Sequence, residues 1–216
     1  ELGYTKHLKT GESHKLKQKI AIIQWISEQG ELEDLYYYQI RLGIEKRAQE
    51  LDYDILRYFN DQPFTLSEEV IGILCIGKFS KAQITSFESY HKPLVFLDSD
   101  TLSLGHTCVI TDFYNAVRQV VDYFTDYGLE RIGILSGLET TTDQEEVIAD
   151  KRLDYFKSYT QEKGIYNEKF IFQGLFTAQS GYDLMKEAIE KLGEKLPQAF
   201  FAASDSLAIG ALRALQ

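Results

Sequence analysis

Short apolar runs alternate with longer amphipathic stretches along most of the chain. The apolar runs are almost continuous in Ile, Val, Leu and Phe, which is typical of strands buried on both faces. We expect such strands at residues 20–26, 53–59, 70–77, 93–98, 107–111, 131–137, 170–174 and 198–204. Apolar residues at helical spacing predict helices at residues 36–51, 80–90, 112–127, 150–163, 178–192 and from 205 onward. This alternation predicts an α/β fold with doubly wound parallel sheets covered by helices on both faces.

The alternation breaks at residues 99–111, where a long loop and a short strand replace a helix. We therefore expect a boundary near Asp112, between an N-terminal subdomain at 19–112 and a C-terminal subdomain at 113–216. Residues 1–18 lack a periodic apolar pattern and are rich in lysine, which predicts a linker. The last helical pattern carries no stop signal, so we expect the C-terminal subdomain to be incomplete in this fragment.

Acidic residues concentrate in two segments between the predicted elements, 28–34 and 140–150. We expect the first to be an acidic loop and the second a solvated loop. The formal net charge of the 216 residues is −10, so this fragment is expected to be repelled by DNA and by anionic membranes. No apolar run is long enough to span a bilayer, and the polar start is unlike a signal peptide. Cys75 and Cys108 lie in strand-like runs, which predicts buried, reduced thiols in a cytosolic protein.

Sequence motifs for catalysis and for cofactors are missing. No G-x-G-x-x-G follows a strand, and the Gly77-Lys78 pair lacks the upstream glycine of a phosphate loop. The four histidines have no metal-ligand spacing, and there is no G-x-S-x-G elbow. We therefore expect no cofactor, no metal and no enzymatic activity, although acid–base pairs need no motif.

Polar and aromatic residues follow the predicted strands at their carboxyl ends. Ligands bind at this edge of open α/β sheets. The residues concerned are Asp98, Arg152, Phe176 and Asp205, with Tyr36 and Tyr37 at the start of the first helix. Carboxylates accept hydrogen bonds from sugar hydroxyls, a guanidinium donates them, and an aromatic ring covers the apolar face of a pyranose. The set therefore predicts a sugar site.

Each of these residues also has a purely structural interpretation. Asp98 and Asp205 could cap turns or helices, since aspartate is favoured at such positions. Arg152 could pair with Asp150 or Asp154 on the surface. Phe176 and the tyrosine run could pack in the core.

Several segments together resemble the lactose-repressor (LacI/GalR) family. The final stretch SDSLAIGALRAL is similar to that family's signature, as are PLVFLD, the segment beginning VITDFYNAV, and ADKRLDYF. The start, LGYTKHLKTG, resembles its hinge, although His7 stands where asparagine is usual. Phe113 also replaces a usual asparagine, and Asp154 or Tyr155 stands in place of a usual glycine.

The resemblance implies a periplasmic-binding-protein-like fold (type I) and a cytoplasmic, dimeric transcriptional repressor that catalyses nothing. It places Asp98, Arg152, Phe176, Asp205, Tyr36 and Tyr37 on effector-contact positions. It further implies a sugar effector, with a galactoside suggested by the segment 28–45, and operator DNA bound through a helix-turn-helix headpiece outside this fragment. Two alternatives stay open: a transport-linked sugar-binding protein of the same fold, and an α/β enzyme that uses Asp98 or Asp205 as base.

Overall fold

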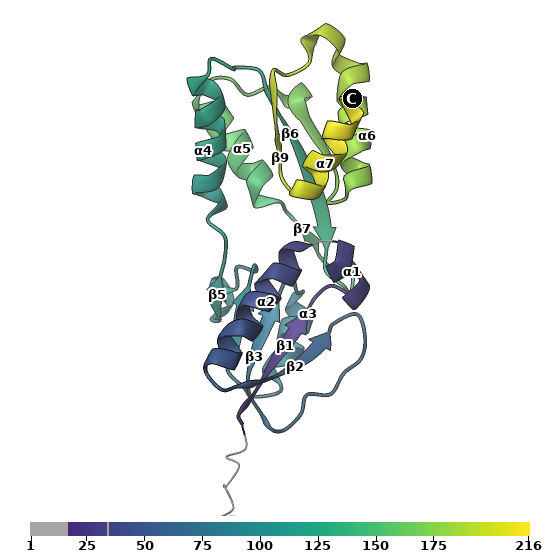
Figure 1. Cartoon of the computed structure of the whole chain (residues 1–216). Coiled ribbons are helices and arrows are strands. Elements are labelled where there is room, and N and C mark those ends of the chain that lie inside the picture. The colour runs from purple at the N-terminus through teal and green to yellow at the C-terminus, as the bar shows by residue number, and fades with distance from the viewer. Residues whose placement is uncertain (1–16, 34) are drawn as a thin grey trace, which may run out of the picture.

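The structure is a computed structural model that describes residues 17–33 and 35–216, and it consists of two lobes (Figure 1). The linker predicted over residues 1–18 therefore lies almost entirely outside the described residues. The first lobe is built on a five-stranded parallel sheet of order β2-β1-β3-β4-β5. Its strands are β1 (Lys19–Gln24), β2 (Asp54–Phe59), β3 (Val70–Ile76), β4 (Leu94–Leu97) and β5 (Thr107–Val109). Its helices are α1 (Glu28–Glu33), α2 (Leu35–Glu50) and α3 (Lys81–Glu88), with the short turn η1 (Leu102–Leu104).

The second lobe is organised around one long strand, β6 (Ile132–Thr140). This strand pairs in parallel with β8 (Ile171–Leu175) and β9 (Ala199–Ala202), and antiparallel with β7 (Val147–Ile148). The helices are α4 (Phe113–Asp126), α5 (Lys151–Glu162), α6 (Ala178–Leu192) and α7 (Asp205–Ala214), with the turns η2 (Glu168–Phe170) and η3 (Gly193–Lys195). The predicted α/β alternation and its parallel sheets are confirmed.

Both faces of the second sheet are buried, as its continuous apolar strands predict. Successive side chains on a strand point to opposite faces. Ile134 packs with Val121 and Phe156 in one core cluster, whereas its neighbour Leu135 packs with Met185 and Leu207 in another. Helices α4 and α5 lie on one side of the sheet and α6 and α7 on the other (Figure 1).

Helices α6 and α7 meet through two glycines. A Cβ on Gly181 would lie 2.2 Å from the carbonyl oxygen of Leu207, and a Cβ on Gly210 would lie 1.9 Å from that of Ala178. Neither approach leaves room for a side chain, so the backbones of the two helices are in direct contact. The glycine in the AIGAL stretch is explained by this packing.

The first acidic segment was wrongly predicted as a loop. It forms α1, and Glu31 is buried there. Arg41 of α2 donates two hydrogen bonds of 2.7 Å to the Glu31 carboxylate, and Gln24 donates a further one. A bidentate arginine satisfies the hydrogen-bonding capacity of a buried carboxylate. The composition of the segment itself could not reveal this partner.

The second acidic segment is also not a simple solvated loop. Its residues Val147–Ile148 form β7, and residues 141–146 contact the first lobe, although several of its side chains are exposed.

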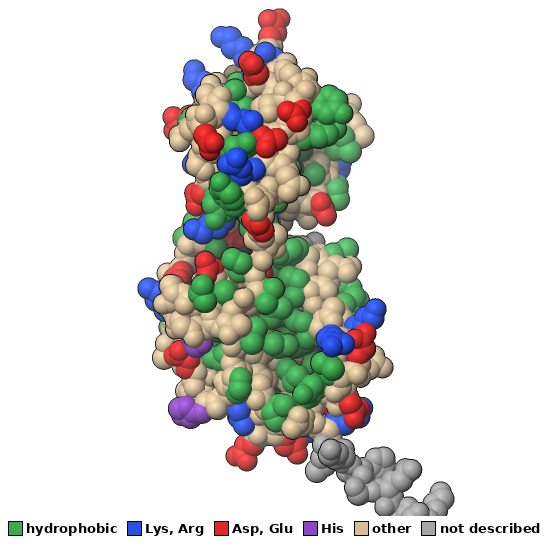
Figure 2. All heavy atoms as spheres, turned by 90° about the vertical axis from the view of Figure 1, so that its left-hand side faces the viewer, with side chains coloured by type: hydrophobic (Ala, Val, Ile, Leu, Met, Phe, Trp, Pro, Cys, Tyr) green, Lys and Arg blue, Asp and Glu red, His purple; other side chains and the backbone are tan. Residues whose placement is uncertain are grey.

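Apolar side chains are exposed on the first lobe, and Figure 2 shows them gathered on one face. An open pocket of about 470 Å³ is lined there by α2 and by the neighbouring strands, including Ile40, Ile44, Leu51, Leu74 and Val95. The apolar face predicted for α2 is therefore only partly covered. Among the described residues, Cys75 is buried and Cys108 half-buried, and both are free thiols. No described helix combines the length and apolar content needed to cross a membrane.

Candidate functional site

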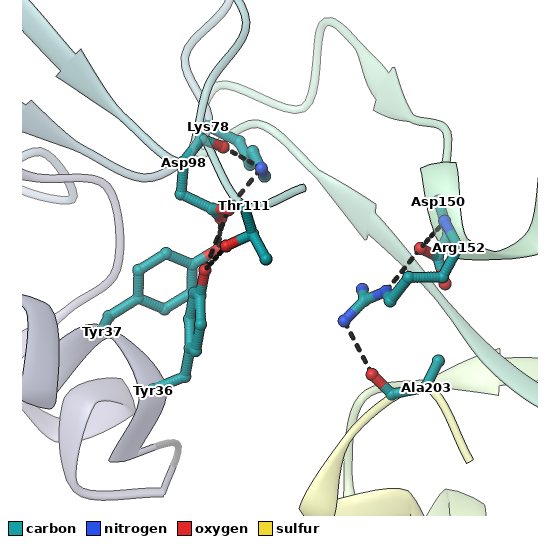
Figure 3. A network of polar contacts seen from close by, with 8 residues as sticks. All are labelled: Tyr36, Tyr37, Lys78, Asp98, Thr111, Asp150, Arg152 and Ala203. Carbon is teal, nitrogen blue, oxygen red and sulfur yellow. Dashed lines mark hydrogen bonds and ion pairs between the residues drawn. The ribbon is translucent and has the colours of Figure 1, made fainter. Parts of the chain in front are cut away.

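Asp98 is the centre of a polar cluster at the carboxyl end of β4. It is buried, and its backbone is left-handed with φ of 64°, a conformation that aspartate tolerates better than most residues. The Tyr37 hydroxyl donates to Oδ2 at 2.8 Å and the Tyr36 hydroxyl to Oδ1 at 3.1 Å. Lys78 Nζ lies 2.9 Å from Oδ2 and also donates to the backbone oxygen of Asp98. Figure 3 shows the three side chains converging on the carboxylate.

The first turn of α2 positions the two tyrosines. Their rings meet edge to face at 5.0 Å, and Tyr37 packs in the same manner on Trp25 at 5.6 Å. Burial raises the pKa of Tyr36 to about 12, and burial also raises the pKa of Tyr37. Both hydroxyls therefore keep their protons at neutral pH and act as donors to Asp98.

Arg152 is the centre of a second cluster, at the start of α5. Its Nε donates to Asp150 Oδ1 and its Nη1 to the backbone oxygen of Ala203, both at 2.7 Å. Its guanidinium carbon lies 4.6 Å from the ring centroid of Phe176 and 4.9 Å from that of Phe113. Such cation–π contacts stabilise a cation where water is partly excluded.

Gly137 makes room for this arrangement. A Cβ at position 137 would lie 2.3 Å from Cδ2 of Phe176. The ring that carries Arg152 thus rests directly on the backbone of β6.

Glu139 interacts electrostatically with charged groups of both clusters. Burial raises its pKa to about 7, against the opposing effects of Lys78 and Arg152, while Asp98 and Asp150 raise it further. Strand β6 positions this carboxyl, because the strand continues beyond Gly137, where the sequence pattern predicted its end. Glu139 was missed for that reason.

The structure groups the predicted residues by lobe. Asp98, Tyr36 and Tyr37 lie together in the first lobe, and Arg152 and Phe176 lie together in the second. Figure 3 shows Arg152 pointing toward the side on which the tyrosines lie, and its charge lowers the pKa of Tyr36, against the larger effect of burial.

Asp205 is not joined to either cluster. It is exposed at the start of α7 and forms no hydrogen bond or ion pair with any residue in the described ranges. It does not cap α7 either, because the Ser204 side chain accepts from Leu207 N at 3.3 Å and is the N-cap. The structural alternative for Asp205, a helix cap, is therefore wrong.

The other structural alternatives have mixed outcomes. Arg152 does pair with Asp150 rather than with Asp154, but within the cluster and not on the open surface. Phe176 packs against the core while it also carries Arg152. Asp98 binds tyrosine hydroxyls and a lysine instead of a helix end.

Five residues of the two clusters were not predicted as site residues, although Asp150 was considered as a partner of Arg152. They are Lys78, Thr111, Phe113, Glu139 and Asp150. Lys78 lies two residues beyond the end of β3, so the strand-end argument that selected Asp98 could have selected it as well. Asp150 Oδ2 is buried without a hydrogen-bond partner in the described part of the chain. In the same residues no group of three or more His, Cys, Asp or Glu is placed to hold a metal ion.

Residues 121–216 match the model of a periplasmic binding protein-like domain. The chain is 58% identical, over its whole length, to the HTH-type transcriptional regulator GalR of Streptococcus thermophilus, of which it spans 65%. It thus covers somewhat less than two thirds of that relative.

Solved structures show the same fold. A complex of the transcriptional regulator CelR with cellobiose matches 92% of the chain and 62% of its own with a TM-score of 0.73 at 21% identity. A Lac repressor dimer bound to operator and the anti-inducer ONPF matches 94% of the chain and 70% of its own with a TM-score of 0.71 at 20% identity. The predicted periplasmic-binding-protein-like fold is confirmed.

Proposed function

Because the chain belongs to the LacI/GalR family of transcriptional regulators, we propose that it is the effector-binding core of a sugar-responsive repressor. The observation that carries this proposal is the pair of polar clusters, centred on Asp98 in one lobe and Arg152 in the other (Figure 3). We take residues 19–112 and 113–216 as the two effector-binding subdomains. The site itself performs no catalysis.

The two clusters offer complementary hydrogen-bonding groups to a sugar. Asp98 and Glu139 accept from hydroxyls, while Lys78 and Arg152 donate. The Nε and Nη1 of Arg152 are engaged by Asp150 and Ala203, which leaves Nη2 to donate toward a ligand. Asp205, exposed beside the strand end that holds Ala203, adds a further acceptor. Phe176 acts by positioning Arg152.

A ligand held by both clusters would couple the orientation of the lobes to its own binding. It shifts the equilibrium between lobe arrangements only by its difference in affinity for them, usually about 1–3 kcal/mol. In a homodimer this change would alter the spacing of DNA-binding headpieces that belong to a cytoplasmic full-length protein. The negative charge of this chain supports the view that operator contact is made outside it.

The effector class is a sugar, and we propose a galactoside. The bound sugar in the CelR structure supports the broader class. The narrower one rests on the resemblance of the segment 28–45 to galactose-type repressors.

Isothermal titration of the full-length protein with galactose, lactose, allolactose and glucose tests the proposal. We expect saturable binding of one galactoside, lost in Arg152→Ala. Arg131→Ala is the matched control, because Arg131 is exposed at the start of β6, at the far end of the same lobe. Binding that survives Arg152→Ala would remove the assignment of the site. Binding of glucose alone would contradict the assignment of a galactoside as the effector.

A further inference from the structure

The hairpin formed by β6 and β7 has an ordered tip, residues 141–146. Thr141 N donates to the backbone oxygen of Glu146 at 3.0 Å, and Gln144 N donates to that of Thr141 at 2.8 Å. The Thr141 side chain is buried, donates to Asp143 Oδ1 and accepts from Glu146 N at 3.2 Å. The tip is therefore held in one conformation by its own hydrogen bonds.

This tip belongs to the second lobe but is bonded to the first. Thr142 Oγ1 accepts from Asn60 Nδ2 at 3.0 Å and from Gln83 Nε2 at 2.7 Å. Asp143 Oδ2 accepts from the Ser80 hydroxyl. Glu146 Oε1 accepts from the backbone N–H of Lys81 at 3.0 Å. We call these four contacts, from Thr142, Asp143 and Glu146 to the first lobe, the clasp.

On the first lobe, three of the four clasp contacts come from the N-terminus of α3, and the fourth comes from Asn60 directly after β2. Ser80 is the N-cap of α3 and forms a capping box with Gln83. A helix N-terminus carries a partial positive charge and free N–H groups, so it favours the carboxylates of Asp143 and Glu146. The pKa of Asp143 is lowered: burial opposes this, but the hydrogen bonds from Ser80 and Thr141 outweigh it. The Asp143 carboxylate thus remains charged and bonded at neutral pH.

The clasp shares no residue with the two effector clusters. Its residues are also not part of the chain connection at Thr111–Asp112, through which the backbone passes between β5 and α4. The lobes therefore have a polar contact that no effector is needed to form.

We propose that the clasp fixes the relative orientation of the two lobes and holds the Asp98 and Arg152 clusters facing each other before the effector binds. Its residues are positioning residues, which contact no ligand. When only part of the population has the binding-competent arrangement, the apparent dissociation constant rises in inverse proportion to that part. Loss of the clasp is therefore expected to weaken effector binding, an expectation that rests on the proposed function.

The direct test measures lobe orientation without any effector. Spin labels on cysteines at the exposed positions Gln49 of α2 and Gln161 of α5 report the distance between the lobes by double electron–electron resonance, with Cys108→Ser to remove the half-buried native thiol. We expect a narrow distance distribution in the otherwise native full-length protein. The double variant Thr142→Val/Asp143→Ala should broaden or shift it.

Two further variants make the outcome decisive. Glu145→Ala removes a neighbouring charge whose side chain makes no clasp contact, and it should leave the distribution unchanged. Asn60→Ala weakens the clasp from the first lobe and leaves the hairpin intact, so it should broaden the distribution even if the double variant disturbs the tip. An unchanged distribution in both clasp variants would overturn the inference.

Effector titration of the same variants is the second readout. We expect the dissociation constant of the double variant to rise about fivefold or more, with Glu145→Ala unchanged. If no sugar binds the native protein, the proposed function fails while the distance measurement still decides the clasp. If sugar binds equally well to all variants despite a broadened distribution, the clasp does not set affinity and that part of the inference is wrong.

Discussion

Arg152, at the start of α5, donates a hydrogen bond of 2.7 Å to the backbone oxygen of Ala203, the residue directly after β9. The same guanidinium is paired with Asp150, whose side chain is 2% exposed. Arg152 therefore has a structural task besides its proposed ligand contact. The geometry therefore predicts that removing its side chain will destabilise the fold as well as weaken ligand binding.

We expect Arg152→Ala to lower the free energy of unfolding by roughly 3 kcal/mol, the low end for a broken buried pair, because it leaves the Asp150 charge unpaired. The double variant Arg152→Ala/Asp150→Ser removes that charge and retains an N-cap for α5, so it should recover much of the loss. Urea denaturation measures both. Sugar binding should stay absent in the double variant, which separates the ligand contact from stability; equal stability of the native protein and Arg152→Ala would contradict this account.

Glu139 should make stability depend on pH. Its pKa is about 7 in the folded protein, raised chiefly by burial from a usual 4.5. Between these values the folded state holds more protons than the unfolded state, so the free energy of unfolding should fall as the pH rises from about 4.5 to 7. Below about pH 4.5 the stability does not depend on pH through Glu139, and above about pH 7 the stabilisation from its raised pKa is completely lost.

Glu139→Gln should flatten this dependence, and urea denaturation at a series of pH values checks it. The exposed Glu145→Gln on the neighbouring hairpin tip is the control and should retain the slope. A slope that is identical in Glu139→Gln and the native protein would show that Glu139 titrates like a solvated carboxyl.

Ser204 and Asp205 should differ in what they contribute to α7. Ser204→Ala removes the N-cap hydrogen bond and should cost about 1 kcal/mol of stability. Asp205→Asn removes only a charge in the first turn, worth about 0.3–1 kcal/mol. Thermal melting without ligand compares the two, and a larger loss for Asp205→Asn would reverse the assignment of the cap.

Gly181 should not accept a methyl group. The Cβ of Gly181→Ala would collide with the Leu207 backbone, so α6 and α7 must move apart at a cost of about 1–3 kcal/mol. Gly43→Ala in the middle of α2 is the matched control. Nothing lies within 4 Å of its added Cβ, so it should stabilise the protein by about 0.5–1 kcal/mol. Denaturant midpoints compare the two variants.

The sequence predicted those features that depend on local periodicity. Helix α6 begins and ends at the residues expected from the spacing of its apolar side chains, and each predicted strand is found. The strand-end argument also selected Asp98 and Arg152, which the structure places at the centres of two polar clusters; their contact with a ligand stays a prediction.

The wrong predictions concern segments whose structure depends on contacts with residues distant in the sequence. Helix α1 was predicted as a loop because its composition is acidic, and only Arg41 makes burial of Glu31 acceptable. The hairpin tip was predicted to be solvated because nothing local indicates that Asn60 and Ser80 bind it. Glu139 was missed because β6 continues beyond the apolar run from which its length was predicted.

Strand β6 has a mechanical consequence for the whole molecule. The Phe176 ring under Arg152 rests on Gly137, Glu139 interacts electrostatically with charged groups of both clusters, and Thr142 lies two residues beyond the end of the strand, in the hairpin tip. An extended backbone is almost inextensible along its axis, because its covalent geometry is already close to full length. The Gly137 backbone that supports the Arg152 cluster and the hairpin tip at residues 141–146 are therefore connected by a stiff segment of extended chain. A displacement of either one along the strand must reach the other with little attenuation.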